Sequence, residues 1–129
     1  MENKILQWLM GYAPLKNLNL EQVGSQVGDC GLFFLGERIE RREEDLLGGA
    51  LLSCRYRCNV RMRCIVGAIN WMQFLGLQDY ITANAPPELG TETTVQCKEL
   101  ELLSRDQTGT ALYQAQLEFT YRRRISCKL

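Results

Sequence analysis

The feature of this sequence that most restricts its fold is an alternation of side chains that runs unbroken from Leu51 to Val66. Every second position holds an apolar or thiol side chain, namely Cys54, Tyr56, Cys58, Val60, Met62, Cys64 and Val66. The positions between them are Ser53, Arg55, Arg57, Asn59, Arg61 and Arg63. A period of two places alternate side chains on opposite faces of a β-strand. The stretch predicts one strand of roughly 50 Å. A strand of that length is expected to bend, twist or reach a neighbouring subunit.

The other segments predict α+β architecture within a single domain spanning residues 1–129. Residues 2–12 carry one apolar stripe, and residues 67–83 are apolar almost all round, so both segments predict helices. Residues 93–124 predict a hairpin whose turn is 106–110, with a bulge near Lys98 and Glu99 where the apolar parity changes. We expect a loop at 13–29 and a mainly antiparallel sheet of three to four strands, with two main helices packed on one face.

The segment before the long strand is densely charged but nearly neutral. Residues 38–45 contain four acidic residues and three arginines. Such a run is typical of a solvated face or of an arm that contacts another subunit. We expect a solvated or inter-subunit arm here rather than a nucleic-acid-binding patch.

Composition and motifs exclude several classes of function. The 15 basic residues balance the 15 acidic ones, so no overall field attracts nucleic acid or anionic membranes. No apolar run is long enough to span a membrane. The absence of histidine, of phosphate-binding loops and of nucleophile motifs argues against an enzyme, a cofactor or a catalytic site.

The cysteines do not predict a metal site. Cys54 and Cys58 are four positions apart on a predicted strand, which separates them by roughly 13 Å. Structural zinc sites use cysteines that are close together in turns, usually as two pairs. We therefore expect no metal, and free buried thiols that pack as small apolar side chains.

The four arginines of the long strand have three possible roles. They can form salt bridges between subunits, lie exposed to solvent, or bind the phosphates of a nucleic acid. The third role lacks the interleaved aromatic side chains on which single-stranded nucleic acids stack. A small nucleic-acid-binding module that uses the arginine face of residues 55–63 remains the alternative.

The order of the segments resembles a known family. A helix with W-L-M-G-Y (Trp8–Tyr12) is followed by G-L-F (Gly31–Phe33), by E-R-R-E-E-D-L-L-G (Glu40–Gly48) and by an R-Y-R strand (Arg55–Arg57). A segment with Trp71 then precedes a closing G-T-A-L-Y strand (Gly109–Tyr113). This order resembles the small minor capsid or tail-completion proteins of Firmicutes phages and prophages, which are similar to phage tail terminators. The resemblance covers most of the chain, although its cysteine content departs from the family's pattern.

The resemblance implies a non-enzymatic virion protein, assembled in the bacterial host cytoplasm. It implies a hexameric ring that caps the tail tube, contacts the tail-tube protein and the head or neck connector, and surrounds a lumen through which DNA passes. A ring requires two complementary patches on each protomer. We predict that one patch comprises Arg38, Glu40, Arg41, Arg42, Glu43, Glu44 and Asp45. Its predicted counterpart comprises Arg55, Arg57, Arg61 and Arg63.

Overall fold

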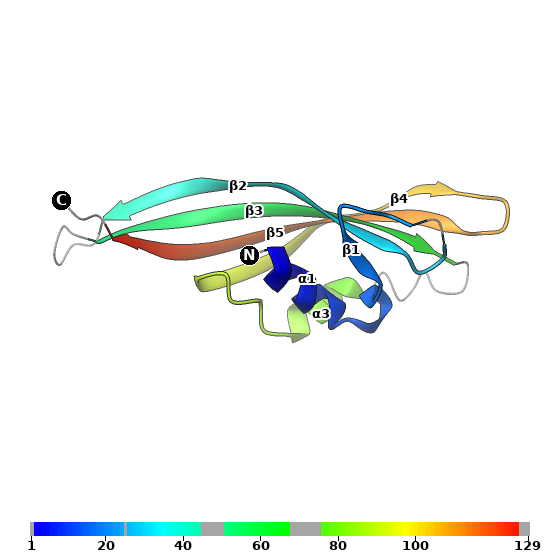
Figure 1. Cartoon of the computed structure of the whole chain (residues 1–129), viewed down its shortest axis with the longest axis horizontal. Coiled ribbons are helices and arrows are strands. Elements are labelled where there is room, and N and C mark those ends of the chain that lie inside the picture. Colours follow the sequence, from blue (N-terminus) through cyan, green and yellow to red (C-terminus); the bar gives the residue numbers. More distant parts are fainter. Residues whose placement is uncertain (1, 25, 45–50, 68–75, 127–129) are drawn as a thin grey trace.

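A long five-stranded sheet in the order β1-β2-β3-β5-β4 dominates the computed structural model (Figure 1). The structure describes residues 2–24, 26–44, 51–67 and 76–126. The strands are β1 (Leu18–Leu20), β2 (Cys30–Glu44), β3 (Leu51–Val66), β4 (Thr91–Arg105) and β5 (Ala111–Ser126). The helices are α1 (Glu2–Met10), the short 3₁₀ turn η1 (Ala13–Leu15) and α3 (Leu77–Ala83).

The sheet corrects the predicted fold. The architecture is α+β, but the sheet has five strands rather than three to four, and β1 is parallel to β2, so the sheet is mixed. The additional strands come from two segments that lack an apolar alternation. The predicted loop at 13–29 contains β1, and the predicted charged arm belongs to β2, which continues to Glu44.

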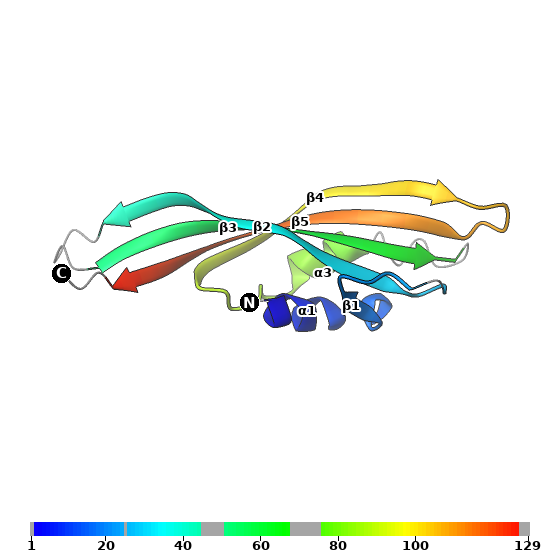
Figure 2. The same cartoon turned by 45° about the horizontal axis from the view of Figure 1, so that its top comes forward.

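The long alternating segment forms β3, the middle strand of the sheet. β3 pairs with β2 on one side and with β5 on the other, and its pairing with β5 runs without a register shift from Leu51 opposite Ser126 to Val66 opposite Ala111. Its partners therefore lie within the chain. The strands twist strongly, and β2, β3 and β5 form an arm that extends beyond the helices (Figures 1 and 2).

The C-terminal hairpin was predicted correctly in its turn and its bulge. β4 and β5 are joined at residues 106–110, where the Asp106 carboxylate accepts hydrogen bonds from the backbone N–H groups of Thr108 and Thr110. Gly109 has a positive φ of 86°, which glycine adopts without strain. The register shift between Cys97 and Glu99 is the bulge that the parity change indicated.

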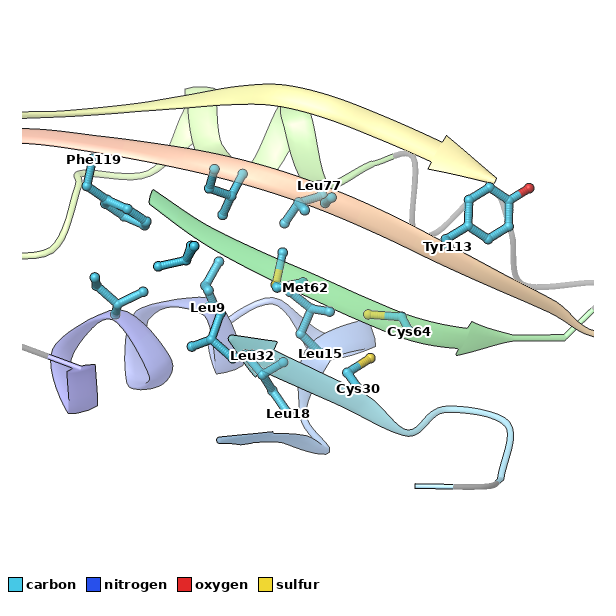
Figure 3. Close-up of a cluster of buried hydrophobic side chains, with 14 of the residues drawn as sticks. Leu9, Leu15, Leu18, Cys30, Leu32, Met62, Cys64, Leu77, Tyr113 and Phe119 are labelled. Atoms are coloured by element: carbon cyan, nitrogen blue, oxygen red, sulfur yellow. The ribbon is translucent and has the colours of Figure 1, made fainter. Parts of the chain in front are cut away.

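One face of the sheet, the helix face, carries the hydrophobic core. α1 and α3 both cover this face (Figures 1 and 2). Leu9 of α1 and Leu77 of α3 are fully buried, together with Met62 of β3 and Leu117 of β5, and Figure 3 shows part of this cluster. A helix was predicted at 67–83. The structure has α3 in the second part of that range, and residues 68–75 lie outside the described residues.

Polar contacts attach α1 to the segment before β4. The indole N–H of Trp8 donates a hydrogen bond of 2.7 Å to the carbonyl of Ala85, and the Tyr80 hydroxyl donates one of 2.8 Å to the carbonyl of Trp8. The Trp8 ring also meets Phe119 edge-on, with centroids 6.0 Å apart. Such aromatic pairs add about 0.5–1.5 kcal/mol to the burial of their surface. The helices are thereby held over the middle of the sheet.

Candidate subunit interface

The four predicted arginines of β3 lie on the face opposite the helices, which we call the open face. The cysteines and Met62 between them are buried on the helix face, as the alternation predicted. Arg55, Arg57, Arg61 and Arg63 are half-buried among neighbouring side chains of β2 and β5. The open face is thus a polar layer built on the middle of the sheet.

Ion pairs within the chain surround Arg57. Its guanidinium contacts the Glu40 carboxylate of β2, and its Nε lies 3.6 Å from Oε1 of Glu118 in β5. Lys98 of β4 approaches the other Glu118 oxygen at 3.5 Å, and Arg55 lies 3.8 Å from Glu40. Glu118 is the most buried of these groups, with a side chain 11% exposed. This network connects four strands of the open face and neutralises part of its arginine charge.

A second polar chain crosses the sheet nearer the β4–β5 turn. Arg63 Nε donates a hydrogen bond of 2.9 Å to the side-chain oxygen of Gln114, whose amide nitrogen donates one of 3.0 Å to Glu101. Gln114 is buried, so these partners replace the water that its amide would otherwise bind. Arg63 therefore also has its partner inside the chain.

Arg61 differs from its neighbours because no hydrogen bond or ion pair to it occurs in the part of the chain that the structure describes. Its Nε atom is buried without a partner. Phe33 of β2 and Gln116 of β5 lie opposite it in register. Burying a guanidinium N–H group without an acceptor is unfavourable. Arg61 is thus the arginine of the open face that an external acceptor would stabilise most.

The two predicted patches are neighbours in one chain. β2 pairs with β3, so Arg38 lies opposite Arg57, and Glu40 bonds the β3 arginines directly. The backbone of Arg41, Arg42, Glu43 and Glu44 belongs to β2, and Asp45 lies outside the described residues. Glu40 therefore has partners inside the chain, and the exposed Arg38 has none among the described residues. The role of these residues in a subunit interface stays a prediction.

Glu118 and Lys98 were missed as members of this surface. The alternation of β5 already placed Glu118 on the face opposite Leu117 and Phe119. It did not indicate that β5 would lie beside β3, which is what brings Glu118 to Arg57. The sequence therefore indicated which face of the sheet Glu118 occupies, but it did not indicate the order of the strands.

A separate polar cluster occupies the helix face of the arm, beyond the helices. The Tyr121 hydroxyl donates a hydrogen bond to the Glu37 carboxylate, and the Tyr121 ring stacks on Tyr56 with centroids 5.6 Å apart. The Arg123 guanidinium lies 5.0 Å from the centre of the Tyr121 ring. Burial, and then the bond to Glu37, raise the pKa of Tyr121 above its ordinary value. These contacts join β2 to β5 across the helix face of β3.

The described residues include no group of three His, Cys, Asp or Glu side chains placed to hold a metal ion. The described cysteines are free, and burial followed by the nearby Glu37 carboxylate raises the pKa of Cys58 to about 11. A polar pocket on the open face is lined by Glu40, Arg55, Arg57 and Thr120. No helix among the described residues has the length and apolar character needed to cross a lipid bilayer.

The sequence matches no protein-family model, and no curated protein matches it.

Proposed function

We propose that this protein is a structural component of a bacteriophage particle that acts by assembling with copies of itself. In the specific form we favour, it is a tail terminator whose ring caps the tail tube and joins it to the head or neck connector. The order of its sequence segments supports this assignment.

The single observation that carries the assembly proposal is the incomplete covering of the sheet. The described helices cover one face, while the other face is a polar layer in which Arg61 has no acceptor among the described residues. Long strands with free edges and a half-covered sheet are suited to contact with further copies of the chain. Glu40 and Glu118 lie against the arginines, which favours a protein surface over a nucleic acid as the partner.

Size-exclusion chromatography with light scattering tests self-assembly, and electron microscopy of the assembled fraction tests for closed rings. We expect a discrete oligomer that binds isolated tail tubes at one end. A monomer at every protein and salt concentration, with no binding to tail tubes, would contradict the proposal.

The nucleic-acid alternative has its own measurement. Fluorescence anisotropy with labelled duplex and single-stranded DNA should show no binding at physiological salt. Affinity that falls steeply with salt and is lost in Arg61→Glu, while the oligomer remains intact, would favour the alternative instead. Lys16→Glu, at an exposed site directly after η1, is the matched control for the reversal of one positive charge.

A further inference from the structure

The two edges of the sheet are free along most of their length in the part of the chain that the structure describes. β1 pairs with β2 only at Cys30–Leu32, so β2 has no described strand on its outer side from Phe33 to Glu44. On the other side of the sheet, β4 is the outermost strand over its whole length. Unpaired strand edges present rows of N–H and C=O groups that can pair with another chain.

Four of the five exposed large apolar side chains of the described residues lie on these edges, and the fifth, Val27, lies in the segment before β2. Leu35 and Ile39 on β2, and Leu102 and Leu103 on β4, are each 41–45% exposed. Both edges also carry charged residues, as natural edge strands usually do. Both edges therefore combine unpaired backbone with apolar side chains.

The strand directions allow the two edges to pair. Direction alternates through β2, β3, β5 and β4, because each of these neighbouring pairs is antiparallel. A second copy in the same orientation, placed alongside β4, therefore presents its β2 antiparallel to β4. Repeated addition continues one antiparallel sheet from copy to copy. Such a head-to-tail interface closes into a ring when the rotation at each step is suitable.

Two irregularities of each edge match. β2 has bulges at Leu35 and Glu40, and β4 has bulges at Lys98 and Leu103, which is the same interval in each strand. A third irregularity of β4, between Thr91 and Thr94, lies near the start of that strand and has no counterpart in β2. A bulge bends its strand and increases the twist, so it turns an edge away from a regular partner. Two edge strands that have bulges at the same interval can still pair along their length. The bulges therefore disfavour pairing with most strands and allow pairing between these two.

One register satisfies the apolar and the charged residues together. Leu35 and Arg38 are separated by the same interval as Glu99 and Leu102, so antiparallel pairing can place Leu35 opposite Leu102 and Arg38 opposite Glu99. In that register the free stretch of β2, Phe33–Glu44, lies opposite 93–104, which is nearly all of β4. The four bulges then lie beside one another in two pairs, to within about one residue.

The two charged residues that meet in this register, Arg38 and Glu99, have no ion-pair partner among the described residues of their own chain. Both are exposed and both lie on the open face. The register also staggers neighbouring copies by about four to five residues, roughly 15 Å, along the strands. A stagger between strands is what a closed sheet of tilted strands requires.

We propose that the β2 edge of one copy pairs with the β4 edge of the next, with Leu35 against Leu102 and Arg38 against Glu99. This rests on the proposed function, since it identifies the surfaces by which the copies assemble. The occupant of each edge is a second copy of this chain.

Charge reversal at the paired positions tests the interface in the full chain. Arg38→Glu and Glu99→Arg should each weaken assembly by at least tenfold in sedimentation velocity, because each places like charges opposite one another. An equimolar mixture of the two variants should assemble again, since every interface of an alternating ring joins opposite charges. The double variant should also assemble. Lys16→Glu should behave as the unaltered protein.

The outcomes separate this inference from the proposed function. If the unaltered protein is a monomer, self-assembly itself fails. If it forms oligomers and both single variants assemble as it does, or if neither mixing nor the double variant restores assembly, the edge pairing is wrong while assembly stands. Circular dichroism checks that the variants fold. Hydrogen exchange of the unaltered protein gives a second readout, because residues 93–104, which already pair with β5 on one side, should gain protection on assembly only if the outer edge of β4 also becomes paired.

Discussion

Removing the Tyr121 hydroxyl should destabilise the arm of the sheet by an amount that depends on pH in a defined direction. In Tyr121→Phe the ring keeps its place on Tyr56 and under Arg123, and the hydrogen bond to Glu37 is lost. Hydrogen bonds to charged groups contribute about 1.5–3 kcal/mol. The Glu37 side chain is 31% exposed, so water can replace the hydroxyl in part. We therefore expect a loss of about 1–2 kcal/mol near pH 8.

The pH dependence follows from the raised pKa of Tyr121 in the folded protein. A tyrosine in the unfolded chain ionises near pH 10.0, whereas burial and Glu37 keep Tyr121 neutral in the fold. The contribution of the hydroxyl is thus complete below pH 10 and declines as the pH rises toward the folded-state pKa. The decline is about 1.4 kcal/mol per pH unit above pH 10. Near pH 11 the unaltered protein and Tyr121→Phe should be about equally stable.

Urea unfolding at pH 8, 10 and 11 measures this difference, and comparison with the variant removes contributions that both proteins share. Tyr56→Phe is the matched control, because its ring belongs to the same stack and no hydrogen bond of its hydroxyl occurs in the described structure. The control should change the free energy of unfolding by less than about 0.5 kcal/mol. Equal losses in the two variants, or a difference that does not shrink above pH 10, would refute the role given to the Tyr121–Glu37 bond.

Three further predictions concern other parts of the fold. The half-buried Cys97 should react with maleimide before the buried Cys58, whose pKa of about 11 keeps it as a thiol, and mass spectrometry of the native protein that showed Cys58 labelled first would contradict this. Gly90→Ala should cost about 1–3 kcal/mol in a thermal melt, because the new methyl group would lie 2.4 Å from the Arg122 carbonyl oxygen; an unchanged melting temperature would argue against that close approach. Asp106→Ala should increase hydrogen exchange in the β4–β5 turn. Hydrogen bonding, first from the Thr108 hydroxyl, lowers the pKa of Asp106, so the difference should be full above pH 4 and decline as the pH falls through the folded-state value; a difference that does not decline as the pH is lowered below 4 would count against it.

The strands that could be predicted are those whose own side chains alternate between a buried and an exposed face. β3 alternates because one of its faces is buried under the helices, and β5 alternates for the same reason. The second half of β2 has no such alternation. Its position at a free edge leaves Ile39 exposed, while Glu37 is held by Tyr121 and Glu40 by β3 arginines. Contacts with residues far away in the sequence make that segment a strand. Its own sequence pattern does not indicate those contacts.

The candidate surface was predictable to the same extent. Alternation assigned each arginine to a face, but it could not assign neighbours, because neighbours depend on strand order and register. The carboxylates nearest in sequence, such as Glu40, were expected to act between subunits, and β2 brings Glu40 to Arg57 within the chain. Glu118 became a partner only because β5 lies between β3 and β4.

The edges indicate how a sheet of this shape can avoid indiscriminate pairing and still select one partner in the pairing that we propose. A long sheet with free, apolar edges would pair indiscriminately if those edges were regular. Here bulges interrupt both edges, and Arg38 and Glu99 add charges of opposite sign. A strand that lacks the matching bulge interval loses backbone hydrogen bonds, and a strand with the wrong charge is repelled. In the pairing that we propose, the features that limit indiscriminate pairing therefore also select the partner, because the opposite edge of another copy meets both conditions.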